Sequence, residues 1–404
     1  MRRGMMLLAC VGLGCGGTAE RRAEPVIHDS LGIRIVEHVD FGEPGTAVWR
    51  VGDVPRINLG ALDAAPAYQF HRLVSAAVLS DGRIVVADAG SQEIRWFDPE
   101  GTHVATAGGR GAGPGEFTSL AALAVMRGDS VVVYDDGLRR LSLFDANATF
   151  VSATPLDREQ RPGMDHPIFA GVLSDGSLLM VGRVLQLEGM TEGPIQSLMP
   201  AYRYRADGSL VDSLRTFPGW EATVVIQQHD GLVGMSIRGR PFGRTTSITP
   251  VGAGFAAGTP YTFSFELFEP TGALRSIIRV DRASSPVTGE DIATYEASLF
   301  EDVDDENARR ELQRELETVV YPETKPAYGL LVGDRDGNVW AQEYQVGDRQ
   351  RDRWNVFAPD GRCAAEVTTP AAFRVMDIGA DYVLGVWQDE LDVEYLQLYE
   401  LSRQ

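Results

Sequence analysis

A strand–turn–strand unit that recurs along the chain constrains the fold more than any other feature of the sequence. In its first copy, Val78–Asp88 reads VLSDGRIVVAD, with an Asp-Gly turn between two apolar runs. Glu93–Gly101 then reads EIRWFDPEG, a third strand with a Pro-x-Gly turn, and Val104–Ala107 lies in a fourth strand. Repeats of roughly 40 to 50 residues made of short strands and tight turns are typical of β-propeller blades. The sequence therefore predicts an all-β propeller.

The number of blades follows from the later copies of the unit. Related units lie near 121–151, 172–214, 247–280, 330–367 and 373–401. The sixth has only three strands, and a missing fourth would leave an open sheet edge. Segments 33–39 and 49–59 are both candidates to fill it. We therefore expect a single domain over 30–404, with six blades and an N-terminal strand completing the last.

Composition excludes some classes of function. The 404 residues have a formal net charge of −20, and a strongly acidic protein is unsuited to nucleic acid or an anionic membrane surface. Lys325 is the single lysine, so the phosphate-binding lysine of a P-loop is absent. The run Gly108–Gly115 lacks that motif's ending, and we interpret it as a turn between blades.

The first residues have the pattern of an export signal. Two arginines precede a short apolar stretch and small residues. The apolar stretch is too short to span a bilayer. Leu7-Leu8-Ala9-Cys10 resembles a bacterial lipobox, whereas Cys15 follows an apolar stretch of more usual length. We expect residues 1–20 to be a leader and tether, with Cys10 or Cys15 lipidated in the periplasm or cell envelope. A plain secretory signal or a misassigned start remains open, and Cys363 is then expected to be a half-buried thiol.

The loop lengths predict one functional face. The turns between the first and second strands of a blade, and between the third and fourth, have two to four residues. The connections on the other face are longer: 108–120, 157–166, 183–199, 216–246, 281–328 and 344–353. Long loops are where function tends to reside. We therefore expect function at the mouth of the central channel on this loop-rich face.

The insertion 281–328, between blades four and five, is predicted to contain helices. Thr288-Gly289-Glu290-Asp291 resembles a capping box. Apolar residues then recur at helical spacing: Ile292, Tyr295, Leu299, Ala308, Leu312, Leu316 and Val319. A helical hairpin that caps the channel mouth and a solvated spacer are both compatible with this pattern.

The first repeat also resembles the NHL-type six-bladed propellers. The matching segments are Asp81-Gly82, Val86-Ala87-Asp88, Ile94–Asp98, Gly101 and Gly108–Phe117. Blade four departs from the pattern at Ala257-Gly258-Thr259. The whole chain is similar to bacterial six-bladed propeller lipoproteins. That resemblance implies a fold and an export route, and it implies no particular ligand.

A metal site is the alternative that would make the chain an enzyme. His71 and His166 precede the first strands of their blades, and Asp88 ends a second strand, so all three are expected near the channel mouth. A zinc- or calcium-dependent lyase or lactonase would need imidazoles and carboxylates there. Asp88 and Asp135 could instead bind backbone N–H groups of the adjacent loops. The acidic segments 301–306 and 389–394 lack the spacing of a calcium loop and fit solvated helix ends and strand edges.

The sequence favours a non-catalytic envelope protein that binds a protein or an extracellular ligand. It contains no Gly-x-Ser-x-Gly elbow and no Cys-x-x-Cys pair. Arginine and aromatic side chains anchor interfaces, and several fall in the long loops. The predicted binding residues are Arg158, Arg161, Arg183, Trp220, Arg240, Phe242 and Arg244, together with the hairpin 288–320. No cofactor is expected for this function, and contact with a membrane is expected only through a lipid anchor.

Overall fold

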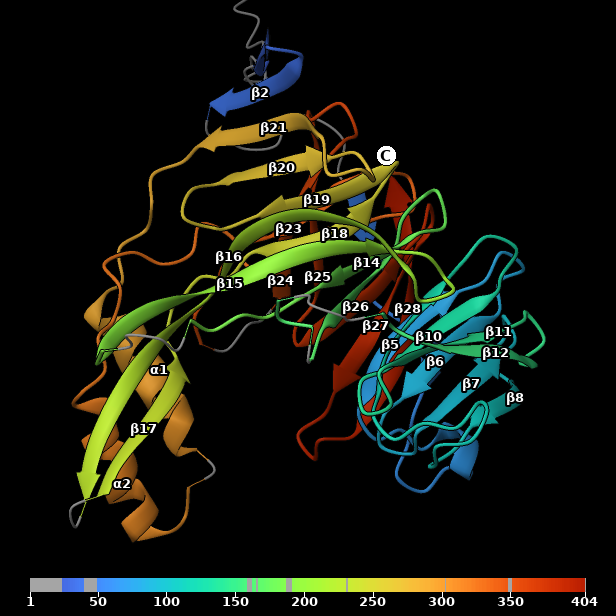
Figure 1. The fold of residues 1–404 in the computed structure, drawn as a ribbon, viewed down its shortest axis with the longest axis horizontal. Helices are drawn as coiled ribbons and strands as arrows, with labels where there is room; N and C mark the ends of the chain where they lie inside the picture. The colour runs from blue at the N-terminus through green and yellow to red at the C-terminus, as the bar shows by residue number, and fades with distance from the viewer. Residues whose placement is uncertain are drawn as a thin grey trace, which may run out of the picture.

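The computed structural model arranges six sheets in chain order as the blades of a propeller (Figure 1). It describes residues 24–39, 49–157, 162–164, 166–186, 191–229, 232–301, 303–347 and 351–403. Within each blade, consecutive strands are neighbours in the sheet. The predicted six-bladed β-propeller is therefore confirmed.

Four blades have the strands that the repeats predict. Blade one contains β5 (Leu73–Val78), β6 (Ile84–Asp88), β7 (Glu93–Phe97) and β8 (His103–Gly108). Blade two contains β9 (Leu120–Val125), β10 (Val131–Asp135), β11 (Arg140–Phe144) and β12 (Phe150–Pro155). Blade four contains β18 (Ser247–Val251), β19 (Gly254–Gly258), β20 (Ser264–Phe268) and β21 (Leu274–Asp281). Blade five contains β22 (Leu331–Gly333), β23 (Val339–Gln342), β24 (Arg351–Phe357) and β25 (Cys363–Pro370).

In blades one, three and five an Asp-Gly pair forms the turn between the first two strands. In blade one, Gly82 has φ +87°, a conformation that glycine adopts readily and other residues rarely do. The Asp81 carboxylate accepts a hydrogen bond from the Arg83 backbone N–H at 3.1 Å. This local bonding explains why the turns could be located from sequence.

Neighbouring blades pack face to face, and each of the six seams between them contains one hydrophobic cluster of described residues. At the seam of blades one and two, the buried rings of Trp96 and Phe144 lie 6.3 Å apart. Second strands such as β6 are buried along their whole length because both of their faces are covered. The core is thus distributed around the ring, which must be closed for every seam to be filled.

Closure of the ring uses the N-terminal part of the chain. Blade six contains β26 (Phe373–Ile378), β27 (Tyr382–Gln388) and β28 (Glu394–Arg403), and β28 pairs with β3 (Trp49–Val51) and β4 (Ile57–Leu59). The other candidate, β2 (Ile33–Val39), pairs in parallel with β21 and forms a hairpin with β1 (Val26–Ser30) on blade four. Of the two predicted candidates, 49–59 therefore closes the last blade, and 33–39 extends a different one.

Blade three is longer than predicted. It contains β13 (Ile168–Val172), β14 (Leu178–Val181), β15 (Gly193–Tyr204), β16 (Leu210–His229) and β17 (Leu232–Gly239). Together β15, β16 and β17 form an arm that reaches past the other blades (Figure 1). The expectation that 183–199 and 216–246 are loops was wrong for most of their described residues. Thr223-Val224-Val225-Ile226, a β-branched run, favours the extended strand.

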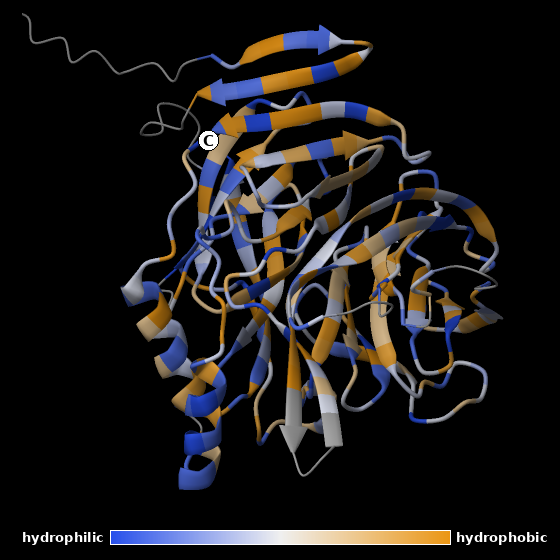
Figure 2. Cartoon of the chain, turned by 60° about the vertical axis from the view of Figure 1, so that its left-hand side comes forward, coloured by the Kyte–Doolittle hydropathy of each residue, from blue (hydrophilic) through white to orange (hydrophobic). Residues whose placement is uncertain are grey.

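The insertion is helical, as predicted. It contains α1 (Gly289–Phe300) and α2 (Glu306–Leu316), and a short 3₁₀ helix, η1 (Pro66–Tyr68), lies elsewhere before blade one. Thr288 and Asp291 form the predicted capping box, and Asp305 caps α2 by accepting from the Ala308 N–H at 2.8 Å. Neither helix has a buried residue, and the cartoon in Figure 2 colours much of the helical insertion as hydrophilic. Its attachment must therefore depend on particular contacts rather than on a core of its own.

Candidate functional site

The cavity at the centre of the ring has a volume of ≈ 710 Å³ and is larger than the second main cavity, which has a volume of ≈ 410 Å³. The first strands of all six blades line it, at the end where the short turns lie. Its charged lining residues are Arg127, Asp129, Asp334, Arg335 and Asp377. This end is opposite the loop-rich face, where we expect function, so the cavity does not coincide with the predicted functional face.

The charged groups at this mouth bind one another and the neighbouring blades. The Asp377 carboxylate accepts from Arg335 at 2.6 Å, from the Val78 N–H at 2.9 Å and from the Tyr382 hydroxyl at 2.9 Å, which joins blades five, six and one. Burial raises the pKa of Tyr382, and the Asp377 carboxylate raises that pKa further. Asp129 accepts from the Ser80 N–H at 3.0 Å and so joins blades one and two. These groups stabilise the ring and are already paired.

Asp88, a residue of the alternative metal site, is fully buried and holds a loop together. Its carboxylate accepts from the Gly90 N–H at 2.9 Å and the His71 N–H at 3.3 Å, and Arg95 lies 3.3 Å away. Asp135 occupies the same position in blade two and accepts from the Thr118 N–H at 2.7 Å. In the structure, both aspartates accept hydrogen bonds from backbone N–H groups of the adjacent loops, which is the second of the two interpretations above.

The two histidines of that alternative site are not brought together with Asp88 around one point. The His71 side chain is exposed, and Asp88 bonds its backbone rather than its ring. His166 is 70% exposed, and its Nδ1 lies 2.9 Å from the Asp136 carboxylate. Across the described residues, no group of three or more His, Cys, Asp or Glu side chains is placed to hold a metal ion.

The predicted binding residues lie on or beside the arm and the insertion where the structure describes them. Arg158 and Arg161, like the lipidation candidates Cys10 and Cys15, fall outside the described residues. Arg183 is exposed, and Trp220 is half-buried in β16. Arg240 is half-buried and donates from Nε to the Val320 carbonyl at 3.0 Å, which ties the end of the arm to the insertion.

Phe242 and Arg244 are buried, with exposed fractions of 6% and 7%. The Phe242 ring lies 5.6 Å from Tyr295 and 5.9 Å from Tyr321, so three aromatic rings join the arm to the insertion. Burial, and then the Glu296 carboxylate, raise the pKa of Tyr321. These contacts correct the expectation that Phe242 lies on an exposed binding rim.

Arg244 holds the base of the insertion against the arm. Its guanidinium donates to the Thr324 carbonyl at 2.7 Å, lies 3.6 Å from the Glu221 carboxylate and faces the Tyr261 ring at 5.2 Å. Further out, Arg238 on β17 donates to Glu315 on α2 at 2.7 Å. The insertion is therefore docked on the arm, and none of its described residues, 281–301 and 303–328, lines the central cavity. That cavity opens at the end of the short turns, so a cap over the mouth on the loop-rich face stays a prediction.

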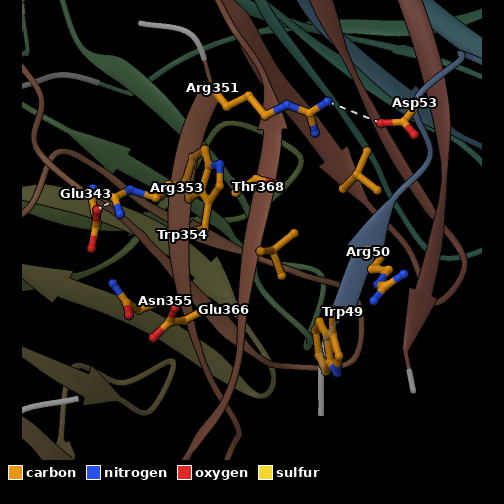
Figure 3. A pocket seen from close by; sticks show the side chains of 12 residues that line it. Trp49, Arg50, Asp53, Glu343, Arg351, Arg353, Trp354, Asn355, Glu366 and Thr368 are labelled. Carbon is orange, nitrogen blue, oxygen red and sulfur yellow. Dashed lines mark hydrogen bonds and ion pairs between the residues drawn. The ribbon is translucent and has the colours of Figure 1, made fainter. Parts of the chain in front are cut away.

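The other main cavity, of ≈ 410 Å³, lies at the seam between blade five and the closing strand β3 (Figure 3). Trp49 and Val51 of β3 line it together with Trp354 and Val367 of blade five. Its other lining residues are polar or charged: Arg50, Asp53, Glu343, Arg351, Arg353, Asn355, Glu366 and Thr368. This pocket could not be predicted from the sequence because about three hundred residues separate β3 from β24. The alternating charges of Arg351-Asp352-Arg353 before Trp354 were the signal in the sequence that could have indicated this pocket.

Comparisons with known proteins agree with the architecture. Residues 72–166 match the model of DUF5128, a family of six-bladed β-propellers. A search of the curated proteins found no match. Among solved structures, a Bacteroides fragilis protein thought to be exported has a TM-score of 0.50 and 12% identity, over 92% of this chain and 99% of that chain.

Two further structures are less similar. A DUF4221 family member from Bacteroides vulgatus has a TM-score of 0.48 and 9% identity, over 88% of this chain and 99% of its own. Virginiamycin B lyase from Staphylococcus aureus has a TM-score of 0.41 and 9% identity, over 87% and 99%. Likenesses this weak support no inference about activity. In the described part of the chain, no helix is both long and apolar enough to cross a membrane. What the comparisons and the sheet topology identify together is the fold, a six-bladed β-propeller.

Proposed function

We propose that the chain is a non-catalytic binding protein of the cell envelope, which recognises a protein or an extracellular ligand with the arm and the insertion. The observation that supports this proposal is the docking of the two elements. Arg244 and Phe242 join two insertions, from blade three and from between blades four and five, into one projecting body. The arm and the insertion do not contribute to the closure of the ring. An exposed surface on a rigid support suits recognition.

The surface of the arm includes apolar side chains exposed beyond the docked helices. Ile226 and Met235 are cross-strand partners on β16 and β17 and are 38% and 53% exposed. Apolar side chains that lie together on a projecting element commonly mark a contact surface. The Asp88 carboxylate is already hydrogen-bonded to backbone N–H groups of its loop, so no observation favours the metal-dependent lyase or lactonase.

Site-specific photo-crosslinking in the native envelope tests the proposal. A photoreactive residue at Met235 should give one adduct, identified by mass spectrometry, with a defined partner. The matched control is Val104 on β8, which is 52% exposed and far from the arm in sequence. Equal labelling from Val104 and Met235 would contradict recognition by the arm.

A second variant tests the insertion. Val287 donates its N–H to the Glu323 carbonyl at 3.0 Å, so the two ends of the insertion lie side by side. Replacing 288–322 by a short Gly-Ser turn should therefore leave the propeller folded and weaken the Met235 adduct. An unchanged adduct would show that the insertion takes no part.

Export and tethering are part of the same proposal, supported by the leader sequence. Two acyl chains on one cysteine would give a stable anchor. Radiolabelled palmitate should be incorporated by the protein and lost when Cys10 and Cys15 are both changed to Ala. Label that persists in the double variant would contradict the lipid anchor.

A further inference from the structure

We infer that the pocket at the seam of blade five and β3 binds a small carboxylate that has a flat apolar body. The site is separate from the arm and the insertion, and its test does not depend on theirs. At ≈ 410 Å³ the pocket falls within the size range of small-molecule sites.

The apolar part of the pocket is an extension of the hydrophobic seam. Trp354 and Val367 are buried members of the cluster between blades five and six, and Trp49 and Val51 pack against that cluster from β3. The Trp354 indole N–H is already bonded to the Thr369 hydroxyl at 3.1 Å and is not available to a ligand, and Trp354 itself is 2% exposed. Aromatic and aliphatic walls of this kind suit a planar ring.

The charged part of the pocket is an ion pair that spans it. Figure 3 shows Arg351 reaching from β24 towards Asp53, which follows β3 on the other side. Arg351 Nη2 lies 3.2 Å from Asp53 Oδ1, and this is the one contact between them. The two side chains are 55% and 84% exposed. Exposed pairs of this kind contribute little free energy, so Asp53 can leave Arg351 at small cost.

Asp53 therefore occupies the place that the carboxylate of a ligand would take. A guanidinium can bind a carboxylate through two parallel hydrogen bonds, whereas Asp53 makes one contact. Arg50 also lines the pocket and forms no ion pair with the described residues, while Arg353 is paired with Glu343 at 2.8 Å. The lining as a whole holds three arginines and three carboxylates, so a ligand carboxylate would be bound by Arg351, with Arg50 also in the lining, and not by a net positive charge.

The test is isothermal titration calorimetry with 2-naphthoate, and with 2-naphthamide as an uncharged probe of the same shape. One naphthoate should bind per chain, and naphthamide should bind at least about tenfold more weakly. Arg351→Gln should weaken naphthoate by a similar factor. Asp53→Asn should strengthen it, because the internal competitor is removed, and a misfolded variant could not give that increase.

The matched control is Arg279→Gln. Arg279 forms an exposed ion pair with Glu37 at 3.2 Å, with exposed fractions of 49% and 42%, on the outer strands of blade four. This variant should bind naphthoate as the parent does. The inference is overturned if naphthamide binds as well as naphthoate, if Arg351→Gln and Arg279→Gln behave alike, or if Asp53→Asn weakens binding.

Discussion

The Arg335 guanidinium lies 2.6 Å from the Asp377 carboxylate and joins the fifth blade to the sixth beside the central cavity. Asp377 is 13% exposed at its side chain and also accepts from the Val78 N–H of blade one. One carboxylate thus connects three blades at the place where the ring closes.

Asp377→Ala is expected to destabilise the protein by about 2 to 4 kcal/mol, because three donors lose their acceptor in a mostly buried position. Urea unfolding of the parent and the variant measures the change. Asp360 offers a matched control, since its carboxylate lies 3.4 Å from Arg362 and both side chains are about half exposed. A loss of stability no larger in Asp377→Ala than in Asp360→Ala would contradict the proposed connection.

The two N-terminal strand pairs should differ in their importance for folding. A chain that starts at residue 61 lacks β3 and β4, and it exposes the edge of β28. We expect that chain to aggregate or to unfold without cooperativity. A chain that starts at residue 41 lacks only the β1–β2 hairpin and keeps all six closed blades, so it should remain monomeric in size-exclusion chromatography. If both truncations behave alike, closure by β3 and β4 is not what stabilises the ring.

Asp88→Ala should lower stability by about 2 to 4 kcal/mol, because the backbone N–H groups of His71 and Gly90 lose a buried acceptor. Since this role needs no metal, the thermal unfolding temperature of the parent should be the same with EDTA and with added zinc or calcium. His166→Ala should change stability little, because His166 is mostly exposed. A metal-dependent unfolding temperature that is lost in His166→Ala would instead support the lyase or lactonase alternative.

Acid should weaken the fold through the aspartates of the tight turns. The Thr149 N–H, and then the Asn147 N–H, lower the pKa of Asp145 from its ordinary value of 3.8. The N–H groups of Val393 and Leu391 do the same for Asp389. A carboxyl whose pKa is lower in the folded state stabilises the protein above the unfolded value, and this contribution is lost as the pH falls through the folded value.

The free energy of unfolding should therefore fall as the pH drops below about 4. The double variant Asp145→Asn and Asp389→Asn should show a shallower fall, because its turn amides do not titrate. Urea unfolding across a pH series measures both slopes, and equal slopes would show that these two turns are not responsible.

Local patterns were sufficient to predict the blades. Asp81-Gly82 and its counterparts specify turns through bonds within a few residues, and β6 is apolar throughout because both of its faces are covered. The capping box at Thr288 is likewise formed by neighbouring residues. Features of this kind need no information from distant parts of the chain.

The seam pocket, the docked insertion and the choice of closing strand were decided by tertiary structure. β2 and β3 are both short apolar strands, and only the packing around the ring places one on blade four and the other on blade six. From the sequence, Phe242 and Arg244 are expected to be exposed loop residues. In the structure they are buried because the insertion covers them. Arg351 meets Asp53 only because the ring closes, which brings the start of the propeller beside its fifth blade. The sequence by itself determined the repeated blade, because its bonds are local, and the closed ring alone determined which distant side chains share a site.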